Sequence, residues 1–174
     1  MSRQLYNAAY AVIGHIRGGL ASATLLGCGG FAALSGSSVA SALTMGKVSL
    51  SEMDRYGYDP RLSTGVVAAG GTLGILIPPS TGFVIFAILT EQSIGRLFLA
   101  GVFPGLLLLA IFVITVSIIC WFRPEAGPPG LRRSLSEKLT AVTGALPILL
   151  VIASTIGGIY GGLFSPVEAA GVGA

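Results

Sequence analysis

The stretch that decides the fold is GTLGILIPPS, residues 71–80, which places two adjacent prolines inside a long apolar run. This run covers residues 62–90 and carries no charged residue. In an α-helix the N–H of residue i donates to the carbonyl of residue i−4, and proline has no N–H. Pro78 and Pro79 therefore leave the carbonyls of Gly74 and Ile75 without helical donors. The sequence predicts a helix that breaks at this point.

The composition around this stretch is that of an integral membrane protein. Of the 174 residues, 53% are hydrophobic and 10% are charged, whereas soluble domains carry about 25% charged residues. A spanning helix needs about 20 apolar residues. Four runs are long enough, namely residues 18–46, 62–90, 97–122 and 139–167. We therefore expect an all-α protein with several crossings of the bilayer.

The first run contains a second discontinuity. Residues 27–42, GCGGFAALSGSSVASA, place Gly36 between serines, where glycine accepts a positive φ and serine bonds the local backbone. The run 18–46 is therefore predicted to be a re-entrant hairpin of two half-helices with its tip at 35–38. With this hairpin, nine of the ten basic residues fall on one side of the membrane, against seven if the run spans fully. The positive-inside rule thus favours a hairpin that enters from the cytoplasm.

The remaining segments follow from this topology. Residues 1–17 are predicted to form an amphipathic interfacial helix, with the apolar side made of Leu5, Ala8, Ala9, Val12, Ile13 and Ile16. Residues 47–61, 91–96 and 123–138 are predicted connectors, the last a cytoplasmic loop. Residues 168–174 are expected to be the start of a further element that is cut short.

A broken helix offers binding groups at both of its ends. Free carbonyls at the end of the first half suit a hard cation such as Na⁺. The second half, expected over residues 82–90 with Ser80 and Thr81 as N-caps, begins with free N–H groups that suit a carboxylate. A proline pair alone is often a packing kink. Two broken elements that meet near the midplane are the pattern of secondary transporters.

Four stretches of the chain then resemble one family. They are GGFAALSGSSVASALTMG (29–46), YGYDPRLSTGVVAAGGTLGILIPPS (56–80), LTEQSIGRLFLAGVFPG (89–105) and GGIYGGLFSPVEAAGVGA (157–174). They are similar to the large membrane subunit of TRAP transporters, the DctM-like permease, over nearly the whole chain. The resemblance implies a Na⁺-driven importer of the bacterial inner membrane that uses an elevator motion. It also implies a periplasmic binding protein, a small four-helix membrane subunit, and an organic acid such as a dicarboxylate or sialic acid as substrate.

The resemblance and the two discontinuities together assign site residues. The expected substrate-binding residues are Ser37, Ser38, Ser80 and Thr81, and the expected Na⁺ ligands come from Ser35, Gly36, Ser37, Gly71, Gly74 and Ile75. No catalytic residue and no cofactor besides the coupling ion are expected. The family's large subunit is longer and has a second hairpin with its own broken helix. The chain is thus expected to be half of an inverted-repeat, elevator-type transporter.

Other classes of protein fit the sequence less well. An ion channel, or another Na⁺-coupled carrier with re-entrant hairpins, could use the same free carbonyls. An intramembrane serine protease would need a base, and His15, the single histidine, lies outside the apolar runs. There is no phosphate-binding loop, no metal-type spacing of the two cysteines, and no basic character that indicates a nucleic-acid partner.

Overall fold

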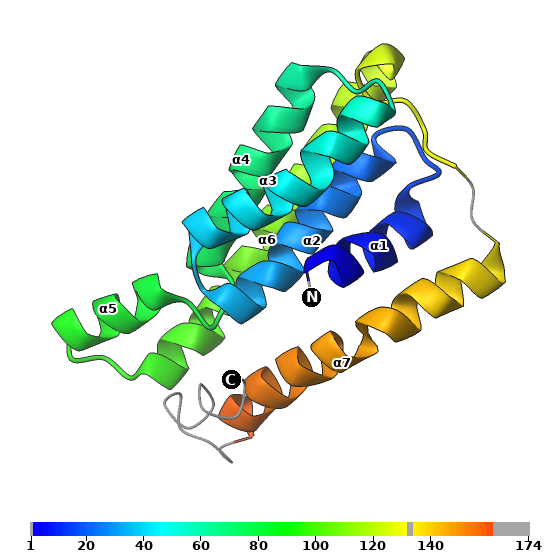
Figure 1. The fold of residues 1–174 in the computed structure, drawn as a ribbon. Coiled ribbons are helices and arrows are strands. Elements are labelled where there is room, and N and C mark those ends of the chain that lie inside the picture. The colour runs from blue at the N-terminus through cyan, green and yellow to red at the C-terminus, as the bar shows by residue number, and fades with distance from the viewer. Residues whose placement is uncertain (1, 132–133, 162–174) are drawn as a thin grey trace.

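The computed structural model describes residues 2–131 and 134–161, which form helices and short connections without a strand (Figure 1). The helices are α1 (Ser2–Ile13), α2 (Gly19–Ser35), α3 (Ser38–Arg55), α4 (Pro60–Leu76), α5 (Thr81–Leu89), α6 (Ile94–Phe122) and α7 (Leu135–Tyr160), with a 3₁₀ turn η1 (Pro124–Ala126) before α7. The all-α prediction is confirmed for this part of the chain. The predictions for residues 162–174, the end of the last span and the start of a further element, lie outside the described residues.

Two described helices are long and apolar enough to cross a membrane unaided, and one bent pair could make a third crossing. The first two are α6, with 29 residues, and α7, with 26 residues. The pair is α4 and α5, bent by 40° at a break of four residues. α7 begins inside the predicted loop 123–138, because Ser134 and Glu137 form a capping box at its start.

The hairpin is longer on its second arm than predicted. α3 continues through Arg55, so residues 47–55 are helical and only residues 56–59 connect α3 to α4. The prediction of a connector over 47–61 was wrong there. Met45, Ser49 and Met53 lie four residues apart and are fully buried, so this polar-looking segment presents one face to the core.

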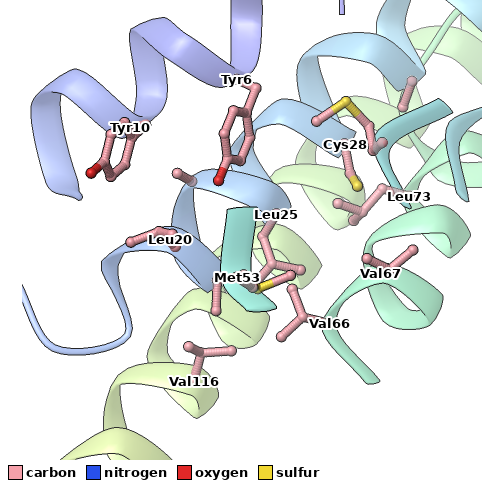
Figure 2. Packing of buried hydrophobic residues seen from close by; sticks show 14 of the residues in the cluster. Tyr6, Tyr10, Leu20, Leu25, Cys28, Met53, Val66, Val67, Leu73 and Val116 are labelled. Carbon is pink, nitrogen blue, oxygen red and sulfur yellow. The ribbon is translucent and has the colours of Figure 1, made fainter. Parts of the chain in front are cut away.

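The core lies around α2, which contacts α1, α3, α4 and α6. Twelve of its 17 residues are buried, so the first arm of the hairpin is the centre of the bundle rather than a surface element. Figure 2 shows Leu25 and Cys28 of α2 packed among Met53 of α3 and Leu73 of α4. Figure 1 shows α5 extending from one end of this bundle and α7 lying beside α1.

α1 packs against the bundle through part of the predicted side and through aromatic residues that the prediction did not include, with Leu5 buried and Ala9 and Ile13 packed on the core. Tyr6, Tyr10 and Ala11 are buried with Leu5, whereas Val12 and Ile16 remain 46% and 44% exposed. The tyrosine rings pack toward the base of the hairpin, where the Tyr10 hydroxyl hydrogen-bonds the Tyr56 hydroxyl at 3.0 Å. A hydropathy pattern ranks tyrosine below valine, so it missed the aromatic residues that carry this contact.

A strap of residues 126–130 ties together the ends of several helices. The Gly18 N–H donates to the Gly127 carbonyl at 2.9 Å, and the Asp59 N–H donates to the Ala126 carbonyl at 3.0 Å. The Gly130 N–H donates to the Gly14 carbonyl at 2.8 Å. The end of α6 is thereby joined to the turns that precede α2 and α4.

Candidate functional site

The tip of the hairpin is a four-residue turn, Ser35 to Ser38, with Gly36 at its sharpest point. Gly36 has φ of +59°, the left-handed conformation that glycine adopts without a steric cost. Ser37 caps α3, because its Oγ accepts from the Ala40 N–H at 3.4 Å. Ser35 Oγ lies 3.2 Å from Ser41 Oγ and accepts from the Ser37 N–H at 3.4 Å. The tip is therefore an ordered cluster of hydroxyl and carbonyl oxygens.

The helix of residues 60–89 breaks where the prolines predict. α4 ends at Leu76, the Ile77 N–H donates to the Leu73 carbonyl at 2.8 Å, and α5 starts at Thr81. Pro78 and Pro79, joined by a cis peptide bond, occupy the break. One helix axis is thus replaced by two axes and a four-residue linker.

The hairpin tip and the break are in direct contact. The Gly36 carbonyl accepts from the Thr81 N–H at 3.2 Å and from Thr81 Oγ1 at 3.0 Å. A Cβ on Gly36 would lie 2.5 Å from the Pro79 carbonyl oxygen. A Cβ on Gly74 would lie 2.7 Å from the Ser37 carbonyl carbon. The two discontinuities, more than 40 residues apart in sequence, form one junction.

One of the two carbonyls predicted to be free has a partner. Ser80 Oγ donates to the Ile75 carbonyl at 2.7 Å, so this hydroxyl takes the place of the N–H that Pro79 lacks. Ser80 occupies the N-cap position of α5, yet its side chain points back to α4 and does not cap. The Gly74 carbonyl has no donor among the described residues. The sequence argument missed the Ser80 bond because it counted only backbone donors.

The predicted site residues divide into a buried and an accessible group. Gly36, Gly71, Gly74 and Ser80 are buried, Ser35, Ser37 and Ser38 are half-buried, and Ile75 and Thr81 are exposed. Gly71 also belongs to the junction, since its Cβ would lie 3.3 Å from the Ser38 carbonyl oxygen. All of these groups are neutral, and residues 62–90 carry no charge. The junction offers oxygen ligands and a helix N-terminus without a formal charge.

A third element, α6, packs on the break, and the predicted site residues include none from it. A Cβ on Gly101 of α6 would collide with the Phe83 ring and lie 3.0 Å from the Leu76 carbonyl oxygen. A Cβ on Gly105 would lie 3.3 Å from the same oxygen. The spacing of these two glycines is typical of close helix packing in membranes, and this was the signal that could have placed them here.

A family comparison identifies the kind of protein to which the chain belongs. The family model for the DctM component of tripartite ATP-independent periplasmic transporters matches residues 1–174. The chain belongs to this family. Described residues 2–131 and 134–161 hold no cluster of three or more histidine, cysteine or acidic side chains that could bind a metal ion. DctM proteins are transporter permeases rather than enzymes, and the prediction that the chain is not an enzyme is confirmed.

Curated relatives carry the same family name. The chain is 47% identical over 174 residues to the C4-dicarboxylate TRAP transporter large permease protein DctM of Pseudomonas aeruginosa. This match covers all of this chain and 40% of the relative. It is 40% identical over 169 residues to the ectoine TRAP transporter large permease protein TeaC of Halomonas elongata, covering 97% of this chain and 39% of the relative. It is 39% identical over 176 residues to DctM of Vibrio cholerae, covering all of this chain and 38% of the relative. The chain spans about 40% of the length of these relatives.

Proposed function

We propose that this chain contributes the first hairpin and the first broken helix to the membrane subunit of a Na⁺-coupled, binding-protein-dependent secondary importer of organic acids. The observation that carries the proposal is the junction of the Gly36 carbonyl with Thr81, which joins two discontinuous elements inside the apolar part of the chain. Discontinuous helices that meet near the midplane form the binding sites of secondary transporters. Membership of an ATP-independent transporter family supports the same reading.

The proposal includes a re-entrant hairpin in the bacterial inner membrane. If α4 and α5 together cross the bilayer, the tip contacts the crossing segment at its break rather than at either end. The Ser35–Ser38 turn therefore lies at membrane depth, where irregular backbone must be buried in protein or face a wet cavity. A tip bonded to the break also makes α2–α5 a single unit that can move as one body, as an elevator mechanism requires.

Cysteine labelling tests the hairpin. Single cysteines at Asn7 and Ser51, both exposed, are placed in a background without Cys28 and Cys120. Membrane-impermeant maleimide is expected to label both from the cytoplasmic side, and a cysteine at exposed Ser93 from the opposite side. Labelling of Asn7→Cys and Ser51→Cys from different sides would remove the re-entrant hairpin.

The proposed Na⁺ ligands are oxygens of Ser35, Gly36, Ser37, Gly71, Gly74 and Ile75. Gly74 contributes a carbonyl without a donor, and the serine hydroxyls contribute neutral oxygens. The Ile75 carbonyl accepts one hydrogen bond, from Ser80, and keeps a second lone pair for a cation. The Gly36 carbonyl accepts two hydrogen bonds from Thr81, so it would have to release one of them to coordinate Na⁺. Hard cations prefer oxygen ligands over sulfur or imidazole, and backbone carbonyls are among the oxygens that they use.

The proposed substrate is an organic acid, a dicarboxylate or a sialic-acid-like molecule, bound near Ser37, Ser38, Ser80 and Thr81. The partial positive charge at the start of α5 suits a carboxylate, and this end is not occupied by an acidic side chain. Two of the relatives are C4-dicarboxylate permeases by name, which supports the substrate class. A periplasmic substrate-binding protein and a small four-helix membrane subunit complete the proposed importer.

Replacement of both prolines by alanine tests the ion site. Pro78→Ala/Pro79→Ala returns two N–H donors, which lets the helix close and takes up the Gly74 carbonyl. Uptake is measured against Na⁺ concentration in the longest natural polypeptide that contains this sequence, with its partners, at matched expression. We expect the half-saturating Na⁺ concentration to rise several-fold or the maximal rate to fall. Pro104→Ala, within continuous α6, is the matched control and should change neither. Unchanged values for the double variant would contradict the ion site.

A further inference from the structure

A second hollow lies at the other end of α4, away from the hairpin tip. It is a groove of about 450 Å³ between α4 and α6, within the range of about 300–1,000 Å³ found for small-molecule sites. Apolar side chains form its two walls, with Leu62, Val66 and Ala69 from α4 and Phe112, Val116 and Ile119 from α6. Leu25 of α2 closes its floor, and it lies close to Val66 and Val116 in Figure 2.

The mouth of the groove is charged, unlike its body. Arg61, at the start of α4, and Arg123, directly after α6, line the mouth together with Asp59. Both arginines are exposed, and neither has an ion-pair partner in the described part of the chain. The Asp59 carboxylate caps α4 by accepting the Arg61 N–H at 2.8 Å, so it is engaged with backbone. The mouth therefore presents two unpaired guanidinium groups.

The groove runs inward from these arginines. Seven residues separate Leu62 from Ala69, which is a rise of about 10 Å along α4. A ligand that fits must therefore be charged at one end and apolar along its length. The groove is also distinct from the proposed transport site, because the 13 residues from Arg61 to Gly74 span about 20 Å of helix.

We propose that this groove binds an anionic phospholipid of the membrane, with its phosphate between Arg61 and Arg123 and an acyl chain between α4 and α6. The complementarity of charge at the mouth carries the choice of ligand, since basic pockets between membrane helices on the cytoplasmic side recognise anionic head groups. The hydrogen bond from the Asp59 N–H to the Ala126 carbonyl holds the two sides of the mouth together. A bound lipid would bridge α4 and α6 at this end.

Lipid titration of purified protein tests the proposal. The longest natural polypeptide containing this sequence is delipidated in detergent and titrated with phosphatidylglycerol or with phosphatidylcholine of the same acyl chains. Melting temperature and bound lipid by native mass spectrometry are recorded. We expect phosphatidylglycerol to bind and raise the melting temperature at a concentration at least tenfold below that of phosphatidylcholine. Arg61→Gln/Arg123→Gln should remove this preference. Arg55→Gln, an exposed arginine outside the groove, should retain it.

A second variant tests the contribution of the apolar groove to lipid binding while both arginines are kept. Gly65 lines the groove, and a Cβ there would meet no atom within 4 Å, so Gly65→Leu fills the groove without a clash at the Cβ position. It should abolish phosphatidylglycerol binding although both arginines remain. Equal affinity for the two lipids in the wild type, or an unchanged preference in the double arginine variant, would overturn the proposal.

A photo-crosslinker identifies the occupant directly. A benzophenone side chain at position 69 reaches into the groove from α4. Illumination in native membranes should give an adduct with the mass of an anionic phospholipid. An adduct with another segment of the polypeptide, or with a second membrane subunit, would show that protein fills the groove and would overturn the lipid assignment.

Discussion

Proline breaks the apolar helix of residues 60–89 but leaves the apolar helix α6 continuous. The helix of residues 60–89 stops at Leu76 and restarts at Thr81, whereas α6, which is 29 residues long, continues without a break through Pro104. Pro104 removes a single N–H, and the turns on either side carry the helix onward. Pro78 and Pro79 remove two consecutive donors, and a side chain replaces one of them, at the Ile75 carbonyl. The Ser80 hydroxyl donates a hydrogen bond to the Ile75 carbonyl, and the Thr81 hydroxyl donates one to the Gly36 carbonyl of the hairpin tip.

The difference shows that tertiary contacts stabilise the break. At the junction, glycines allow backbone to approach backbone, as at Gly74 against Ser37 and Gly36 against Pro79. On α6, Gly101 and Gly105 lie against the break, while Phe103, Leu106 and Trp121 are exposed. Four substitutions test this comparison, in order of decreasing expected effect.

Gly36→Ala should have the largest effect on stability. The residue must keep φ near +59°, and its Cβ would meet the Pro79 carbonyl oxygen at 2.5 Å. We expect a loss of about 2–4 kcal/mol, the sum of left-handed strain and overpacking. Gly57→Ala is the control, because Gly57 has φ of +71° and open space around it. It should lose only about 1–2 kcal/mol. Equal losses of stability for the two variants in thermal unfolding would mean that Gly36 is not in close contact with the Pro79 carbonyl at the break.

Gly74→Ala should destabilise the protein by about 1–3 kcal/mol through overpacking, because its Cβ would meet the backbone of Ser37 and Ser38 within 2.8 Å. Gly65→Ala lies on the same helix with no atom within 4 Å of its Cβ. It should instead stabilise by about 0.5–1 kcal/mol, because alanine has the higher helix propensity. Chemical denaturation in detergent gives both values. A stabilising Gly74→Ala would contradict the close approach of α4 to the hairpin tip.

Ser80→Ala should cost about 1 kcal/mol, because it removes the donor that replaces a helical N–H at the Ile75 carbonyl. Ser117→Ala is the same chemical change on α6. Its hydroxyl donates to the Val113 carbonyl at 2.8 Å within a continuous helix, where a backbone donor remains. The control should therefore change stability by less than about 0.5 kcal/mol. Similar effects of the two variants on the melting temperature would show that the break gains nothing from Ser80.

Pro104→Ala should have the smallest effect, with the opposite sign. One N–H returns to a helix that already continues through this position, so we expect a gain of up to about 1 kcal/mol. Thermal unfolding measures the gain. Destabilisation by Pro104→Ala would indicate that the proline ring packs a necessary contact, and that the two proline sites differ less than the comparison states.

The sequence by itself determined the class of the protein and the places where helices must stop. Low charge and long apolar runs required membrane helices, because charged groups are costly in a bilayer. Pro78 and Pro79 required a break, because missing N–H groups cannot be supplied by the local helix. Gly36 among serines required a turn. These are local properties of the chain, and a sequence carries local properties directly.

Only the tertiary structure decided which groups meet. The bond between Gly36 and Thr81 joins residues 45 positions apart, and no local pattern specifies it. The same holds for the buried side of α1, where Tyr6 and Tyr10 face the bundle while Val12 remains exposed. It also holds for the extension of α3 to Arg55, which depends on the burial of Met53. Each of these outcomes depends on the partner surface, because packing stabilises a helix face only where another element covers it.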